Sequence, residues 1–228
     1  METPFYSTAN GFVYEPSEDS FLLLDGLEKD LQLIKDARPT ICLEIGVGSG
    51  IITSALSKHL GVNGFSYFIC TDVNPNAGIA CKETFNLNNL IYSPEIVLTN
   101  LIDSLEHRLQ SNVDLIVFNP PYVPTDDCEI ESDNLLTKSW AGGIKGRRVI
   151  DKFIETIINV IADDGLIYLL LSQENQPDEV IEILEKVNIK LDEIVIKRKC
   201  LNEHLIVLRF RKKKSQQLTQ SIGKLKIS

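Results

Sequence analysis

Apolar residues fall into two kinds of segment, short runs rich in β-branched residues and longer stretches with apolar positions three or four apart. The short runs are typical of strands buried on both faces, and the longer stretches are typical of amphipathic helices. The predicted strands cover residues 41–45, 65–71, 95–99, 113–118, 165–171, 190–199 and 204–210. The predicted helices cover residues 14–37, 51–60, 75–88, 103–110, 147–161 and 179–187.

The order of these elements predicts the topology of the sheet. The first five strands alternate with helices and should run parallel, because consecutive parallel strands need a crossover connection. Only residues 200–203 separate the last two strands, so these two should form an antiparallel hairpin. We predict one α/β domain at residues 14–210, with a flexible arm at 1–13 and a basic, disordered tail at 211–228.

A glycine loop follows the first strand. Gly46 is the first residue and Gly48 the third residue of the sequence Gly-Val-Gly-Ser-Gly, which lies directly between the strand and a helix. Such a loop lets a ligand approach the backbone, while the helix that follows presents free N–H groups. The motif is shared by proteins that bind dinucleotides and nucleosides. Glu44 is a charge inside a strand, which predicts a ligand or an N–H partner close to it.

Polar residues also follow the second and third strands. Asp72 is placed to accept hydrogen bonds from both hydroxyl groups of a ribose. The alternative role is an N-cap, because Pro75 could begin the next helix. Asn100 and Leu101 follow the third strand, where a side chain could meet an adenine edge. The acidic segment 15–20 at the start of the first helix could reach over the same ligand.

The fourth strand ends at the sequence Asn119-Pro120-Pro121-Tyr122. Two consecutive prolines end the strand and stiffen the turn, since proline lacks an N–H and has a fixed φ. The Asn119 side-chain oxygen and the Pro120 carbonyl can each accept one N–H of an amide or an exocyclic amine, and Tyr122 offers a flat face for stacking. The alternative is a rigid turn with a surface tyrosine.

A long polar segment at residues 123–145 follows this turn and could form the wall that faces the substrate. Trp140 lies either in an ordered turn of this segment or in the core.

Composition narrows the class of protein. The net charge of −9 disfavours a bare phosphate backbone as the main partner, so nucleic acid is an unlikely ligand. The five cysteines show no paired spacing, which favours reduced thiols in a cytosolic compartment over a metal site or disulfides. No apolar run is long enough for a membrane helix and no signal peptide is present, so we expect a soluble protein. The basic tail leaves the nucleus as a second location beside the cytoplasm.

Several stretches together resemble the class I S-adenosylmethionine-dependent methyltransferases of the HemK type. These enzymes methylate the glutamine amide of a Gly-Gly-Gln loop in translation release factors. The resemblance extends from Tyr14 to about Phe210, and four stretches are similar to the eukaryotic and archaeal branch. These stretches are residues 14–24, 42–50, 117–123 and 140–143.

The resemblance implies a single-domain Rossmann-like class I methyltransferase fold, with a seven-stranded, mostly parallel sheet and an antiparallel C-terminal hairpin. It implies S-adenosylmethionine as the cofactor and no metal. The implied cofactor contacts are Ser20, Glu44, Gly46, Gly48, Asp72, Asn100, Leu101 and Asn119. The implied catalytic residues are Asn119, Pro120, Pro121 and Tyr122. One departure is Asn100, because the family usually has Asp there; an uncharged Asn predicts a weaker contact with adenine.

The resemblance also implies two protein partners, a translation release factor as the substrate and a small zinc-binding activator subunit. The activator is expected to extend the sheet at the third strand, residues 95–99, whose exposed edge would benefit from cover.

Four alternatives remain at this point. An adenine-N6 methyltransferase of DNA or RNA uses a similar clamp, but the acidic charge and the lack of a target-recognition insert argue against it. A protein lysine methyltransferase would have to deprotonate its substrate, for which an amide-shaped clamp has no obvious means. A nicotinamide dehydrogenase would have no use for the Asn-Pro-Pro-Tyr sequence. A catalytically silent scaffold would bind the cofactor and a partner without turnover.

Overall fold

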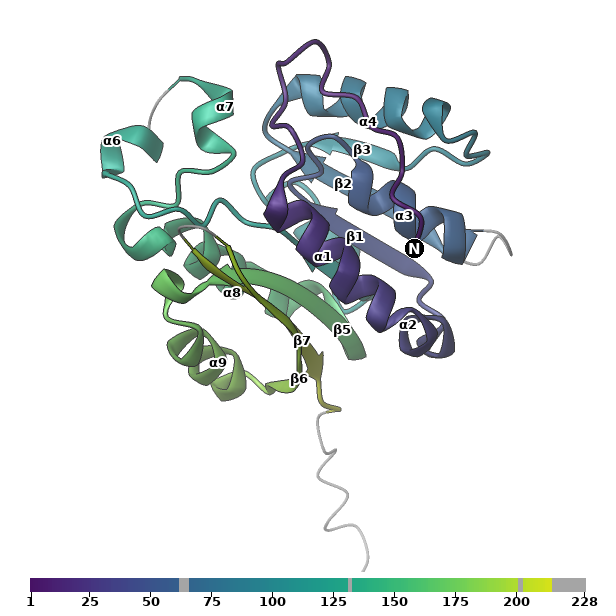
Figure 1. Ribbon diagram of the computed structural model, residues 1–228. Helices are drawn as coiled ribbons and strands as arrows, with labels where there is room; N and C mark the ends of the chain where they lie inside the picture. Colours follow the sequence, from purple (N-terminus) through teal and green to yellow (C-terminus); the bar gives the residue numbers. More distant parts are fainter. Residues whose placement is uncertain (62–65, 131–132, 201–202, 215–228) are drawn as a thin grey trace, which may run out of the picture.

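A computed structural model describes residues 1–61, 66–130, 133–200 and 203–214. Seven strands form a single sheet in the order β3-β2-β1-β4-β5-β7-β6, with helices on both faces (Figure 1). The strands are β1 Ile41–Ile45, β2 Tyr67–Asp72, β3 Glu95–Leu98, β4 Val113–Phe118, β5 Ile161–Ser172, β6 Ile189–Lys199 and β7 His204–Lys212.

The pairing of these strands confirms the predicted topology. Strands β3, β2, β1, β4 and β5 are paired in parallel, and β7 lies antiparallel between β5 and β6. The chain leaves β1 toward β2 and β3 on one side and returns to β4 on the other side. The carboxyl ends of β1 and β4 therefore flank the point where the strand order reverses, which is where open α/β sheets bind ligands.

Helices α1, α3 and α4 cover one face of the sheet in Figure 1, and α8 and α9 cover the other face. The helices are α1 Glu18–Lys29, α2 Leu31–Ala37, α3 Ile51–Leu60, α4 Pro75–Leu87, α5 Glu106–Leu109, α6 Asp127–Ile130, α7 Leu135–Lys138, α8 Arg148–Val160 and α9 Pro177–Lys186. Two short 3-10 turns are η2 Ile144–Gly146 and η3 Gln173–Asn175. None of the helices in the described ranges is long and apolar enough to cross a membrane.

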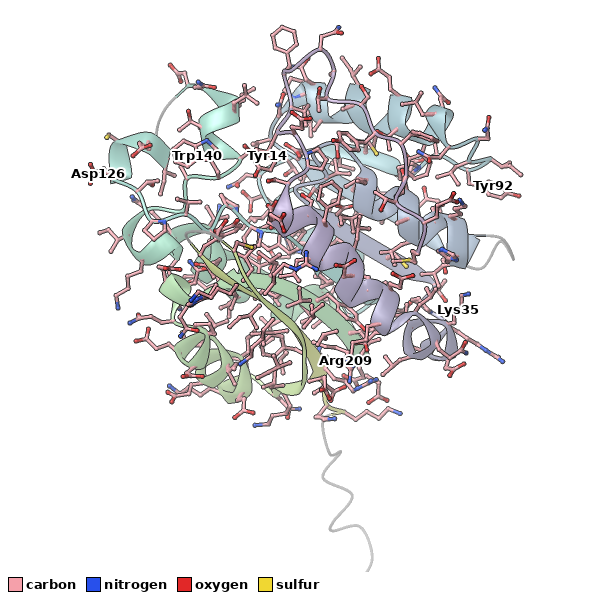
Figure 2. All side chains as sticks on the ribbon, in the orientation of Figure 1. Tyr14, Lys35, Tyr92, Asp126, Trp140 and Arg209 are labelled. Carbon is pink, nitrogen blue, oxygen red and sulfur yellow. The ribbon has the colours of Figure 1, made fainter. Side chains whose placement is uncertain are left out.

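The first predicted helix is wrong in two respects. It begins at Glu18 rather than at residue 14, and it breaks at Asp30 into α1 and α2. The apolar spacing continues across the break, so the sequence pattern does not reveal it. Asp30 is buried at the break, where it accepts hydrogen bonds from Tyr168 (3.0 Å) and from Arg209, which is labelled in Figure 2.

The segment at residues 123–145 also differs from the predicted loop, because it contains α6 and α7. Its two ends are joined by hydrogen bonds from the Val123 N–H to the Trp140 carbonyl (3.0 Å) and from the Gly142 N–H to the Val123 carbonyl (2.8 Å). Trp140 is partly exposed, so its place is in this ordered turn and not in the core. We refer to residues 123–146 as the outer segment.

Other element ends differ from the predictions by a few residues. Only Glu106–Leu109 of the predicted 103–110 helix is helical, and turns precede it. Arg211 and Lys212 belong to β7 rather than to the predicted tail, most of which lies outside the described residues. Phe65, the predicted start of the second strand, also lies outside them.

Residues 1–13, the predicted arm, form neither a helix nor a strand, and they run over α4 (Figure 1). The Phe5 N–H donates to the Asn88 side chain (3.1 Å) and the Ser7 N–H donates to the Thr84 hydroxyl (2.9 Å). Val13 is buried at the end of the arm. The arm thus has a defined position on α4, and its flexibility stays a prediction.

The cysteines in the described residues are free thiols. Three of them lie in the core, namely Cys42, Cys70 and Cys81.

Candidate active site

A cavity of about 440 Å³ opens at the carboxyl ends of β1, β2 and β4. Most of the residues predicted from the sequence come together in its lining. These are Ser20, Glu44, Gly46, Gly48, Asp72, Asn100, Leu101, Asn119 and Pro121. Pro120 and Tyr122 are buried beside the cavity and do not line it. The volume lies within the range of about 300–1,000 Å³ that is usual for small-molecule sites.

The glycine loop between β1 and α3 forms the floor of the cavity. Gly46 and Gly48 have φ values of 67° and 51°, which glycine adopts more readily than other residues. Gly50 has φ 77° and lies at the N-cap of α3, where a side chain would collide with the Cys81 backbone. The loop therefore brings the backbone and the amino end of α3 close to a ligand.

Asp72 joins this loop to the turn after β2. Its carboxylate accepts hydrogen bonds from the Gly48 N–H (2.9 Å) and the Asn74 N–H (2.8 Å), and burial raises its pKa. The alternative role as the N-cap of α4 belongs to Asn74, whose side chain accepts from the Asn76 N–H. Asp72 thus faces the cavity and has lone pairs left to accept the hydroxyl groups of a ribose.

Glu44 has the N–H partner that its place in a strand predicts. The Thr53 N–H of α3 donates to Glu44 Oε2 (2.9 Å), and the Thr53 hydroxyl donates to the same oxygen. Burial nevertheless raises the pKa of Glu44 to about 8, because an ionised carboxylate is poorly solvated there. Glu44 is therefore mostly neutral at pH 7, and Thr53 is a partner that the sequence analysis did not single out.

Asn119 lies at the end of β4 with its side-chain amide in a defined orientation. Its Nδ2 atom donates to Asp19 Oδ2 at 2.8 Å. Its Oδ1 atom is buried and has no hydrogen-bond partner among the described residues. A buried acceptor without a partner costs free energy, so this oxygen marks a place for a donor that a ligand supplies.

Tyr122 is held from two directions. Its carbonyl accepts from the Asn175 side chain (2.8 Å), and its hydroxyl interacts with the carboxylate of Glu203 at the β6–β7 connection. A side chain at Gly146 would overlap the same carbonyl oxygen. Only 8% of Tyr122 is exposed, so the open stacking face expected from the sequence is largely covered in this structure. Burial raises the pKa of the Tyr122 hydroxyl.

The outer segment contributes part of the cavity lining, and that it faces the substrate stays a prediction. Its cavity-lining residues are mainly apolar, and Ile130, Leu135, Leu136 and Ala141 are among them. In Figure 1 this segment stands apart from α4, across the carboxyl end of the sheet.

Several residues in or beside the cavity were not singled out individually from the sequence. Val13, Tyr14 and Pro16 lead into α1 and close one side of the cavity, and Figure 2 labels Tyr14 there. Asp19 lies in the acidic segment that was expected over the ligand, although the sequence does not show that it bonds to Asn119. Asn175 gave no signal in the sequence, because its partners are backbone carbonyls far away in the chain.

The residues present fit S-adenosylmethionine. Asp72 suits the ribose and the glycine loop suits a close approach of the backbone. Asn100 donates its side-chain amide to Asp103 (3.4 Å), which leaves its oxygen to accept from an adenine amino group.

The order of the strands, the antiparallel C-terminal hairpin and this cavity define a class I methyltransferase. A family model, the methyltransferase small domain, matches residues 17–138. The chain is 38% identical over 214 residues to methyltransferase HEMK2 of Homo sapiens, covering 92% of this chain and 96% of that protein. It is 34% identical to the eRF1 methyltransferase catalytic subunit mtq2 of Schizosaccharomyces pombe, covering 86% of this chain and 88% of that protein.

A solved structure gives the same assignment. The Mtq2–Trm112 complex of E. cuniculi, which methylates the translation termination factor eRF1, is similar with a TM-score of 0.64 and 31% identity. The match covers 89% of this chain and 99% of that one. The chain belongs to the methyltransferase small-domain family, within the group of HEMK2 and Mtq2. S-adenosylmethionine is the methyl donor of this class.

Proposed function

We propose that this chain transfers a methyl group from S-adenosylmethionine to the side-chain amide nitrogen of the glutamine in the Gly-Gly-Gln loop of a translation release factor. We further propose that it acts as the catalytic subunit of a heterodimer in the cytoplasm, where translation takes place. The observation that carries the proposal is the buried, unpaired Oδ1 atom of Asn119 in the cavity lining. The names of the relatives agree with this activity.

A glutamine amide is a poor nucleophile, because its nitrogen lone pair is delocalised into the carbonyl group. In the proposed mechanism Asn119 Oδ1 accepts one N–H of this amide, which fixes the nitrogen in the cavity and increases its electron density. The resemblance assigns the second N–H to the Pro120 carbonyl. Pro120 lies outside the cavity lining, so this role stays a prediction.

The bound cofactor supplies an electrophilic methyl group on a sulfonium sulfur. The chain's own residues orient it: Asp72 holds the ribose, and the glycine loop and Ser20 belong to the lining of the same cavity. The apolar residues of the outer segment exclude water from the other side. No general base is required, since the amide nitrogen can lose its proton to solvent after the transfer.

We assign the activator subunit to the outer edge of β3 and infer that it is a zinc-binding protein, as the resemblance implies. Strand β3 ends the sheet, so its outer backbone groups have no strand beside them in the described part of the chain. Exposed apolar side chains surround this edge, among them Tyr67, Ile91, Tyr92 and Leu98. Figure 2 shows Tyr92 projecting outward there.

Co-purification tests this assignment. Leu98→Asp places a charge on the proposed interface, and it should reduce recovery of the activator with the chain by at least about tenfold. Ile183→Asp changes an exposed apolar residue of α9 and is the matched control. Equal recovery with both variants would contradict the assignment of the activator to β3.

The function itself is tested by mass-spectrometric mapping. The chain with its activator is mixed with labelled S-adenosylmethionine and release factor, and the modified residue is located. One methyl group on the amide of the Gly-Gly-Gln glutamine is expected. A methyl group on lysine or on added nucleic acid, or no transfer at all, would overturn the proposal.

A further inference from the structure

We infer that Asp19 is a positioning residue for methyl transfer, because its carboxylate fixes which end of the Asn119 side-chain amide faces the substrate. This inference rests on the proposed function for its consequence in catalysis. The hydrogen bond from which it starts is a property of the chain alone.

The contact joins two distant parts of the chain. Asp19 lies in the first turn of α1 and is 6% exposed, and Asn119 lies 100 positions further along at the end of β4. The Asn119 Nδ2 to Asp19 Oδ2 distance is 2.8 Å, which is an ordinary length for a hydrogen bond to a charged acceptor. The other carboxylate oxygen of Asp19 accepts from the Ser20 hydroxyl at 3.4 Å. Both oxygens of this carboxylate are therefore directed at donors.

An asparagine amide can rotate by half a turn, which exchanges its oxygen and its nitrogen. An ionised carboxylate only accepts hydrogen bonds, so Asp19 can pair with the NH₂ end of Asn119 and not with the oxygen end. The rotated amide would place two oxygens against each other. Asp19 thereby selects the orientation in which Asn119 Oδ1 is left over, and this is the atom found without a partner at the cavity.

The orientation decides whether a substrate amide can bind. Asn119 Oδ1 can accept an N–H from the glutamine amide, whereas the rotated Asn119 would present an NH₂ group to another NH₂ group. Without Asp19 both orientations become accessible, and only one of them is competent. Free rotation alone would only about halve the competent fraction. An Asn119 side chain that Asp19 no longer holds can also move out of its productive position, and a misplacement of about 1 Å can cost about a hundredfold in rate.

A second explanation for Asp19 is structural, since an acidic residue in the first turn stabilises a helix. Glu18 is the matched control for that role, because it lies in the same turn with its side chain largely exposed and forms its ion pair with Arg198. Glu18→Ala removes a carboxylate from the first turn without touching Asn119. Asp19→Asn is a second test variant of nearly unchanged shape, but its amide can donate as well as accept, so it does not select one orientation of Asn119.

Kinetics of the single and double variants separate the two roles. With activator and release factor present, Asp19→Ala should lower kcat about ten- to a hundredfold and change cofactor affinity, measured by calorimetry, by less than about twofold. Asp19→Ala combined with Asn119→Ala should be no slower than Asn119→Ala alone, because the orientation of a missing side chain has no effect. Asp19→Asn should also lower kcat, because its amide can pair with either orientation of Asn119. Additive losses in the double variant, or an Asp19→Asn variant as fast as the unmodified chain, would overturn the inference.

A measurement without substrate tests the hydrogen bond independently of the proposed function. In protein labelled with ¹⁵N-asparagine, the NH₂ signal that disappears in Asn119→Ala belongs to Asn119. Its hydrogen exchange should be slow in the unmodified chain and in Glu18→Ala, and at least about tenfold faster in Asp19→Ala. An exchange rate that is the same in all three proteins would contradict the inference. If the hydrogen bond is found but release factor is not methylated, the proposed function fails and the orienting contact stands.

Discussion

The two sides of the cavity are built in different ways. On the cofactor side the bonded residues are near neighbours in the sequence: Thr53 and Glu44 are 9 positions apart, and Gly48 and Asp72 are 24 apart. On the substrate side Asn175 and Tyr122 are 53 positions apart, and Asn119 and Asp19 are 100 apart. The cofactor side is thus largely formed by one β1-α3-β2 unit, whereas the substrate side depends on tertiary packing. Substitutions far from the reacting atoms should therefore affect substrate handling more than cofactor binding.

The largest effect is expected from Gly146→Ala. A Cβ atom there would overlap the Tyr122 carbonyl oxygen, and φ +64° disfavours alanine. We expect kcat/KM to fall by more than about a hundredfold, because the turn that carries Asn119 must shift. The free energy of unfolding should fall by about 2–4 kcal/mol.

Gly11→Ala is the matched control for this variant. Gly11 has a similar conformation, with φ +85°, but a Cβ atom there meets nothing within 4 Å. It should lose about 1 kcal/mol of stability and retain its activity. Equal losses of activity in both variants would show that backbone strain, and not the position of Tyr122, explains the result.

The next largest effect is expected on the cofactor side. Asp72→Ala removes an acceptor from the N–H groups of Gly48 and Asn74, and it removes the proposed ribose contact. The dissociation constant for S-adenosylmethionine should rise about a hundredfold in calorimetry, since hydrogen bonds to charged groups are worth about 1.5–3 kcal/mol each. Asp25→Ala, which removes a half-exposed carboxylate paired with Arg198 outside the cavity lining, should leave this dissociation constant unchanged. An unchanged dissociation constant for Asp72→Ala would contradict the assigned role.

Asn175→Ala tests the substrate side without touching the cavity lining. Its side-chain amide donates to the carbonyls of Tyr122, Lys145 and Gly146, and it is fully buried. Leaving these carbonyls unpaired should lower kcat/KM about ten- to a hundredfold and change cofactor affinity by less than about twofold. Asn112→Ala, an exposed asparagine with one local bond to the Gln110 carbonyl, should behave as the unmodified chain. Loss of cofactor affinity in Asn175→Ala would erase the distinction between the two sides.

The smallest effect concerns the pH dependence of stability. Glu44 has a pKa of about 8 in the folded chain against 4.5 as its ordinary value. Between these pH values the folded state therefore binds a proton at Glu44 that the unfolded state has lost. Stability should fall as pH rises from about 4.5 to about 8, and it should level off above that. Glu44→Gln should weaken this decline, by an amount on the order of 1–3 kcal/mol, in thermal unfolding without cofactor. A decline of the same size in the variant would assign the pH dependence to other groups, such as Asp72.

The sequence predicts the sheet well, because its information is local. Apolar runs identify the strands, and the short connection at residues 200–203 identifies the antiparallel hairpin. The break at Asp30 could not be predicted, since its cause is the contact with Arg209 and Tyr168 in distant strands. The helices of the outer segment were missed for a related reason, because four-residue helices leave no periodic pattern.

The same division applies to the site. The positions of Gly46, Gly48 and Asp72 around the cavity follow from their places at the ends of β1 and β2. The partners of Asn119 and Tyr122 do not follow from the sequence, because Asp19 and Asn175 meet them only after the sheet and α1 have assembled. The covering of Tyr122 is likewise a tertiary effect, since Glu203 reaches its hydroxyl from the last hairpin.

The central claim is that Asn119 holds the amide that receives the methyl group, and Asn119→Ala tests it most directly. Turnover of release factor and the dissociation constant for S-adenosylmethionine are measured on the same preparation of the complex. We predict that kcat falls at least about a hundredfold while the dissociation constant changes by only a few fold. An equal loss of turnover and of cofactor affinity would show that Asn119 binds the cofactor and does not hold the substrate.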